Sequence, residues 1–194
     1  MRHWLFHPLI FYPLAILVAA LLIGFSLQPQ RWAREAGPVA AQQAEAALVY
    51  GRDAFDRPDA SPEQHMTVVR DFLGGARALR IAVKPDQPAP TPADRGVRVL
   101  MTPDDAARIA DRPVTVEVTY TPSPVNAASG LAVSLQGDGP TAWVSQEIPP
   151  QPNTVRFELP AQAAVNAIGL RALSSNNDQA YGLEITRIRV IPRA

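Results

Sequence analysis

The stretch VTVEVTY, residues 114–120, alternates apolar and polar side chains with a period of two. Successive side chains of a β-strand point to opposite faces, so this pattern predicts a strand with one buried and one wet face. The same alternation recurs in LAVSL (131–135) and VRFEL (155–159). Turn residues separate these segments, which favours antiparallel strands that each cover one side of a common core.

Further strands are predicted on both sides of this region. They are expected at Ala78 to Val83, Val97 to Met101, Thr141 to Glu147, Val165 to Leu173 and Tyr181 to Ile191. In the last segment the apolar positions change parity, which predicts a β-bulge near Thr186 and Arg187. About eight short strands separated by Pro, Gly and Asn turns indicate an all-β fold, an antiparallel β-sandwich of the jelly-roll type.

Two short helices are predicted beside the strands. The order Ser-Pro-Glu-Gln at 61–64 is that of a capping box, and apolar residues follow at helical spacing, which indicates a helix at about 62–73. Thr102 before Pro103 and two aspartates indicates a second helix, Pro103 to Ala110. The Pro-rich piece from Lys84 to Gly96 is predicted as a stiff surface loop.

The amino-terminal segment is apolar and carries no charged side chain from His3 to Gln30. As a helix, Leu9 to Leu27 would reach roughly 28 Å, close to the ~30 Å hydrocarbon core of a bilayer. Trp4, Phe6, Tyr12 and Trp32 would lie at the two membrane interfaces. The segment therefore predicts a single transmembrane anchor, and the alternative is a signal peptide cleaved near 24–26.

This reading divides the chain into an anchor (1–30), a linker (31–47) and a β-sandwich domain (48–194). Arginines on both sides of the apolar run leave its orientation open by charge alone, and a short head before the run favours a cytoplasmic amino terminus. The 17 arginines against one lysine, with abundant Ala and Pro, are typical of a GC-rich bacterial genome. We therefore expect a bacterial inner-membrane protein with a periplasmic domain, whose first partner is the lipid bilayer.

Composition argues against several functions. The formal net charge is zero, which disfavours nucleic acid as a partner. The chain has no cysteine, and His65 is the one histidine after the apolar run, so an ordinary zinc site or nucleophilic triad is not expected. No cofactor is predicted, although Asp53, Asp56 and Asp59 could supply oxygen ligands to calcium. We expect a protein that is not an enzyme.

Four segments resemble the jelly-roll modules of the carbohydrate-binding and galactose-binding-like type. They are ADRPVTVEVTYTPSP (110–124), LAVSLQGDGPTAWVS (131–145), NTVRFELP (153–160) and YGLEITRIRV (181–190). The resemblance covers about half of the chain and rests on pattern and turn placement. It implies a β-sandwich that binds a glycan, with a ligand surface that differs from branch to branch.

Trp143 is the leading candidate for ligand contact. Ala142 and Val144 take the apolar parity of that segment, so the indole is predicted to be exposed beside Thr141 and Ser145. An exposed indole stacks on a sugar ring or anchors a protein partner, and the alternative is that it covers the sandwich edge. The predicted surface adds Tyr181 and an amide-rich loop that comprises Asn176, Asn177, Asp178 and Gln179.

The sequence therefore predicts a non-catalytic, membrane-anchored envelope module that binds a glycan or an envelope protein. The alternative is a structural or accessory subunit of a larger inner-membrane complex. A glycan-active enzyme with paired carboxylates, such as Asp104 with Asp105, is the distant third class.

Overall fold

The computed structural model describes residues 7–27, 34–61, 65–84, 87–174 and 181–193. By its internal contacts the chain divides into two compact units, Met1–Trp32 and Ala33–Ala194. Each unit is considered by itself.

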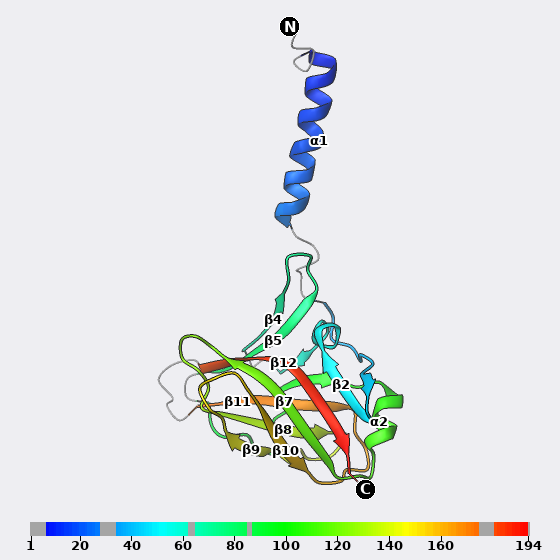
Figure 1. Cartoon of the computed structure of the whole chain (residues 1–194), viewed down its shortest axis with the longest axis vertical. Coiled ribbons are helices and arrows are strands. Elements are labelled where there is room, and N and C mark those ends of the chain that lie inside the picture. The colour runs from blue at the N-terminus through cyan, green and yellow to red at the C-terminus, as the bar shows by residue number, and fades with distance from the viewer. Residues whose placement is uncertain (1–6, 28–33, 62–64, 85–86, 175–180, 194) are drawn as a thin grey trace. The chain divides into compact units, whose positions relative to one another are not determined.

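The first unit contains helix α1, Pro8–Leu27, which has no charged residue in its first or last turn and includes Pro13 (Figure 1). Its described side chains are exposed all along the helix, and Leu9 is 81% exposed. Among the residues that the structure describes, no helix has both the length and the apolar character needed to cross a membrane. The transmembrane anchor predicted from the sequence therefore has no support from the structure and stays a prediction.

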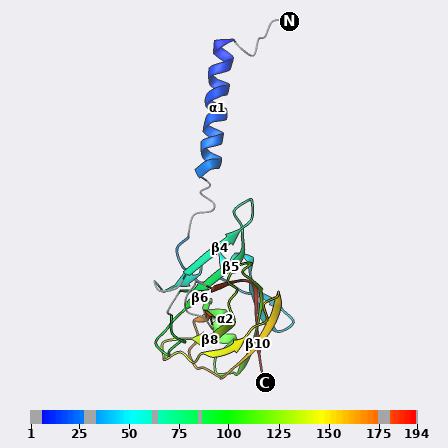
Figure 2. The same ribbon diagram turned by 90° about the vertical axis from the view of Figure 1, so that its left-hand side faces the viewer.

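The second unit is built of two antiparallel sheets, so the predicted all-β sandwich is confirmed (Figures 1 and 2). The seven-stranded sheet contains β1 (Gln42–Ala44), β2 (Ala47–Gly51), β4 (His65–Arg70), β5 (Ala76–Val83), β7 (Val114–Pro122), β10 (Asn153–Leu159) and β12 (Tyr181–Pro192). The five-stranded sheet has the order β3 (Asp59–Ala60), β6 (Val97–Leu100), β11 (Ala167–Leu173), β8 (Gly130–Gln136), β9 (Val144–Glu147). A 3-10 turn, η3 (Arg52–Phe55), and helix α2 (Pro103–Ile109) complete the domain.

The core lies between the inner faces of the two sheets. In β7 the three valines and Tyr120 are buried, while the alternating Thr and Glu side chains are more accessible, as the alternation predicts. Phe157 of β10 pairs with Val116 of β7 in the antiparallel register, and both side chains are fully buried. On the opposite sheet Leu131 and Ile168 belong to the same core.

Strand β12 joins the parts of the larger sheet. Residues 181–185 pair with β5, residues 187–190 pair with β2, and the register against β7 shifts between Ile185 and Arg187. The predicted bulge is therefore confirmed. It lets β12 change its partner on one side while it stays paired with β7 on the other.

The predicted helix at 62–73 is wrong. The described part of that segment, from His65 onward, is strand β4 and a turn that leads back into β5. Met66 and Val68 pack partly against the core, whereas His65 and Thr67 are exposed, which is the period of a strand. Cross-strand pairing and burial outweigh the local capping signal.

The second predicted helix is confirmed as α2. The Thr102 side chain accepts a hydrogen bond from the Asp105 backbone N–H at 3.3 Å. Asp105 is buried and its carboxylate accepts hydrogen bonds from the backbone N–H of Ala41 at 2.8 Å and from the Thr102 hydroxyl at 2.9 Å. The segment predicted as a linker, 31–47, thus contains strand β1 and is held to α2 at Ala41.

Candidate binding face

The outer face of the five-stranded sheet is unusual because it is polar and yet buried. In β8, Leu131, Val133 and Leu135 point into the core, and Ser134 and Gln136 lie on the other face. Every residue of β8 is nevertheless buried. Some other part of the chain must therefore cover this outer face.

The cover is the Pro-rich segment 87–96, which we call the strap. The Gln136 side-chain amide donates a hydrogen bond to the Arg95 carbonyl at 2.9 Å, and the backbone N–H of Thr141 donates to the Pro92 carbonyl at 3.0 Å. The strap ends at Gly96, whose φ is +61°. The predicted surface loop is therefore fastened across the sheet.

Arg171 of β11 ties the centre of the sheet to the strap. Its guanidinium donates to the Asp94 carboxylate at 2.7 Å and to the Pro88 carbonyl at 2.5 Å, and its side chain is 2% exposed. The Arg171 Nε has no hydrogen-bond partner among the described residues. A buried guanidinium with one unused donor is costly, so the site has a remaining capacity for an acceptor.

The electrostatics of the strap favour an ionised Asp94. Desolvation raises the pKa of the Asp94 carboxyl, but hydrogen bonds from Thr91 and the charge of Arg171 act in the opposite direction, and the net pKa is lowered. The backbone N–H of Thr91 donates to this carboxylate at 2.7 Å. The Asp94–Arg171 pair is thus charged at neutral pH.

Trp143 lies at the edge of the outer face and is half-buried, so the prediction of an exposed ring is wrong. Its indole N–H donates to the Thr91 carbonyl of the strap at 3.1 Å, and its ring packs beside Gly96. The parity argument failed because the strand begins only at Val144, and Ala142, predicted to be apolar-facing, is exposed. The open alternative, that Trp143 covers the sandwich edge, describes its position better.

Tyr181, the other predicted site residue that the structure describes, does not lie in the same sheet as the strand that follows Trp143. Tyr181 is half-buried against the core at the start of β12, in the seven-stranded sheet. Asn176, Asn177, Asp178 and Gln179 lie outside the described residues. The combined surface predicted from these residues therefore stays a prediction.

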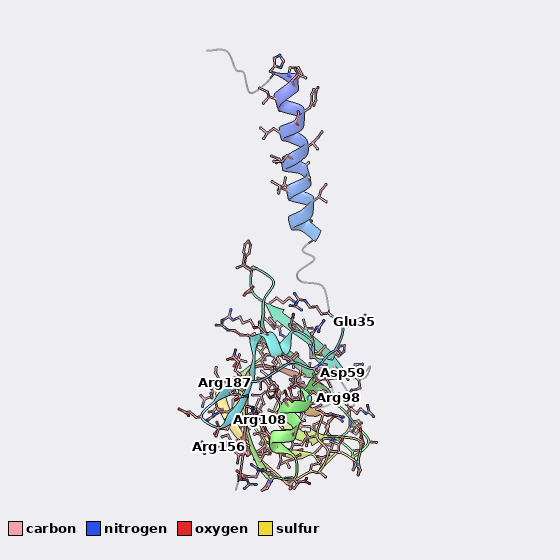
Figure 3. All side chains as sticks on the ribbon, turned by 90° about the vertical axis from the view of Figure 1, so that its right-hand side faces the viewer. Glu35, Asp59, Arg98, Arg108, Arg156 and Arg187 are labelled. Atoms are coloured by element: carbon pink, nitrogen blue, oxygen red, sulfur yellow. The ribbon has the colours of Figure 1, made fainter. Side chains whose placement is uncertain are left out.

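Two charged residues of this face, Arg98 of β6 and Arg171 of β11, were not anticipated from the sequence. Arg98 of β6 forms an ion pair with Asp59 of β3, and Figure 3 shows the two side chains at neighbouring strands. In the strand register Arg98 lies opposite Gly169 of β11, and Gly169 lies opposite Ser134 of β8, so these residues form one row across the sheet. The available signal was a single arginine at the outward position of otherwise apolar strands, in VRVL and in GLRAL.

Two of the three carboxylates considered for calcium form ion pairs with arginines. Asp56 pairs with both Arg34 and Arg70, and Asp59 pairs with Arg98. Within the described ranges, no group of three or more His, Cys, Asp or Glu side chains could hold a metal ion. Asp56 and Asp59 therefore act as ion-pair partners within the fold.

Comparison with known proteins identifies structural relatives only. No protein-family model matches the sequence, and no curated protein matches it. A xylan-binding CBM22-1 domain from Paenibacillus barcinonensis Xyn10C is 13% identical, with a TM-score of 0.44 over 78% of this chain and 100% of the domain. The carbohydrate-binding module CBM1 of BiXyn10A is 11% identical, with a TM-score of 0.42 over 81% of this chain and 98% of that module.

A third similar structure comprises the CBM22-1 and GH10 modules of Clostridium thermocellum xylanase 10B with xylohexaose. It is 7% identical, with a TM-score of 0.45, and the match covers 83% of this chain and 29% of that one. Likenesses at this distance do not establish a ligand. The protein is thus an antiparallel β-sandwich, and the solved structures that it resembles include carbohydrate-binding modules.

Proposed function

We propose that this chain is a non-catalytic module that binds a glycan of the bacterial cell envelope at the outer face of the five-stranded sheet. The observation that carries the proposal is the buried polar face itself, with Trp143 at its edge and Arg171 near its centre. An interior guanidinium and amide on a sheet face are costly for folding alone, which favours a binding role.

The chemistry of the face suits a glycan with many acceptors. A half-exposed indole offers a ring on which a sugar can stack. Arg171, Gln136 and Trp143 all present N–H donors, and carbonyl or carboxylate oxygens of the strap accept from them. Hydroxyl and carboxylate oxygens of a sugar could accept from the same groups once the strap moves aside.

We also propose that the module is held at the bacterial inner membrane by α1, with the sandwich domain in the periplasm. The support is the uncharged run from His3 to Gln30 and the exposure of apolar side chains along α1. Apolar surface of this extent on a soluble protein would be unusual. Insertion into lipid would remove it from water.

Affinity electrophoresis of the full chain in detergent tests the glycan proposal, with soluble envelope polysaccharides cast in the gel. Trp143→Ala should lose at least about tenfold in affinity, which corresponds to about 1.4 kcal/mol. Trp143→Phe is the matched control, because it keeps one aromatic ring for stacking, although it removes both the N–H donor to Thr91 and the second ring of the indole. It should retain most of the binding.

Unretarded migration of the wild-type chain in every polysaccharide would contradict glycan binding. Equal retardation of wild type and Trp143→Ala would place the glycan on another surface. Recovery of one stoichiometric envelope protein from a detergent extract, without any glycan retention, would instead support the accessory-subunit alternative.

A further inference from the structure

The turn between β4 and β5 is a rigid tip that carries two large apolar residues. The Asp71 backbone N–H donates to the Gly75 carbonyl at 2.8 Å, and the Gly75 N–H donates back to the Asp71 carboxylate at 2.8 Å. Gly74 takes a φ of +87°, a left-handed conformation that glycine adopts without steric cost. Phe72 and Leu73 are therefore held at the apex of an ordered turn, which projects from the sandwich domain (Figures 1 and 2).

Both side chains at this apex face water. Phe72 is 78% exposed and Leu73 is 82% exposed. Outside α1, the described part of the chain holds one other large apolar side chain with comparable exposure, Val125 at 76%. Turn apices usually carry Gly, Asn, Asp, Ser or Pro, so an adjacent Phe and Leu at this position need an explanation other than folding.

The base of the hairpin is also where the chain enters the sandwich domain. Asp56 forms ion pairs with Arg70, the last residue of β4, and with Arg34, near the start of the domain. The Arg70 guanidinium also donates to the Gly74 carbonyl at 3.0 Å, which fixes the tip to its base. Residues 28–33 alone separate α1 from the domain, and the seven Cα–Cα steps from Leu27 to Arg34 reach at most about 25 Å when extended.

We infer that the Phe72–Leu73 tip inserts into the interfacial layer of the lipid bilayer that receives α1. This inference rests on the proposed membrane attachment through α1. The short connection limits how far the base of the hairpin can lie from the end of α1. A Phe and a Leu at the headgroup boundary bury apolar surface, and the exposed Arg77 beside the tip can meet anionic lipid headgroups.

The chain has no cysteine, so one introduced thiol gives a unique label. The full chain with Leu73→Cys is labelled with an environment-sensitive fluorophore and reconstituted into liposomes of neutral and anionic phospholipid. The matched control is Asp138→Cys, an exposed position in the turn that follows β8. Lipids with a nitroxide near the headgroup serve as quenchers, and flotation in a density gradient reports membrane attachment separately.

Both labelled chains are expected to float. Emission from the label at position 73 should shift to the blue, and nitroxide lipids should quench it about threefold more than emission from the label at position 138. This is the result expected for a residue buried about 5–10 Å into the interface. Flotation with equal quenching at the two positions would overturn the tip inference and leave membrane attachment intact. Failure to float would overturn the attachment, and the tip inference with it. A blue shift that depends on protein concentration and not on nitroxide lipid would indicate self-association through the tip, and would also overturn the inference.

Discussion

Replacement of Gly96 by alanine is the sharpest test of how the strap is fastened. At a φ of +61° a residue other than glycine has a conformational free energy that is higher by about 1–2 kcal/mol. The new Cβ would also lie 2.7 Å from the Leu170 carbonyl oxygen and 2.9 Å from the Trp143 ring atom Cη2. Overpacking of this kind costs about 1–3 kcal/mol. Gly96→Ala should therefore lower the free energy of unfolding by about 2–5 kcal/mol.

Equilibrium urea unfolding of the full chain in mild detergent, followed by circular dichroism in the strand region, measures this loss. Gly139→Ala is the matched control, because an added Cβ there meets no heavy atom within 4 Å, and its effect should stay within about 0.5 kcal/mol. Addition of Trp143→Ala to Gly96→Ala should recover part of the loss, since one of the two close contacts disappears. Equal unfolding midpoints for Gly96→Ala and Gly139→Ala would refute the close packing of the strap against the sheet.

Four other experiments test the core, the site and the attachment. Phe157→Ala removes a fully buried ring and should cost about 3–5 kcal/mol in urea unfolding, and a loss below 1 kcal/mol would contradict its place in the core. Trp143→Ala should cost about 2–3 kcal/mol, because truncation of a partly buried ring costs less than the ~3–5 kcal/mol of a fully buried aromatic residue, and no loss would mean that the ring does not pack on the strap. For Asp94 the folded pKa is lowered, so its contribution to stability is present above the unfolded value near 3.9 and is lost as the pH falls through the folded pKa. Asp94→Asn should accordingly destabilise the chain at pH 7 and show a smaller further loss below pH 4, and a parallel pH profile for wild type and variant would contradict this. Alkaline carbonate should leave the chain in the membrane pellet with residues before Ser26 present by mass spectrometry, whereas a mature terminus near Leu27 would show that the segment is a cleaved signal.

The strands were predictable where one face of the sheet meets the core and the other meets water. In VTVEVTY the period of two is complete, and β7 follows it residue by residue. The hairpin of β4 was not predictable in this way, because Val68 and Val69 are both half-buried and its apolar tip continues the run into Phe72 and Leu73. The apolar residues of the strand and the apolar residues of the turn together give a spacing that looks like that of a helix.

The candidate site was predictable only in part. The strap covers the outer face of the sheet, so a side chain that the alternation places on that face is not necessarily exposed to water. Trp143 was singled out from the parity of its segment, but its exposure depends on a segment about fifty residues earlier in the chain. Arg171 could not be recognised as a buried residue from the local sequence, since an arginine on the outer face of a strand is ordinarily solvated. Long-range coverage of a sheet face leaves no periodic signal in either of the two segments.

The composition of the strap accounts for the direction of its hydrogen bonds. Proline has no backbone N–H, so a Pro-rich segment presents carbonyl acceptors with few donors to compete for them. The sheet and the segment before β9 supply the matching donors. The Pro88, Thr91, Pro92 and Arg95 carbonyls accept from Arg171, Trp143, Thr141 and Gln136 in that order. Removal of the strap would leave the sheet face with several unpaired donors, which is costly in a water-poor site. A ligand that takes the place of the strap must therefore be rich in acceptors, and an acidic glycan meets that requirement better than an apolar peptide surface.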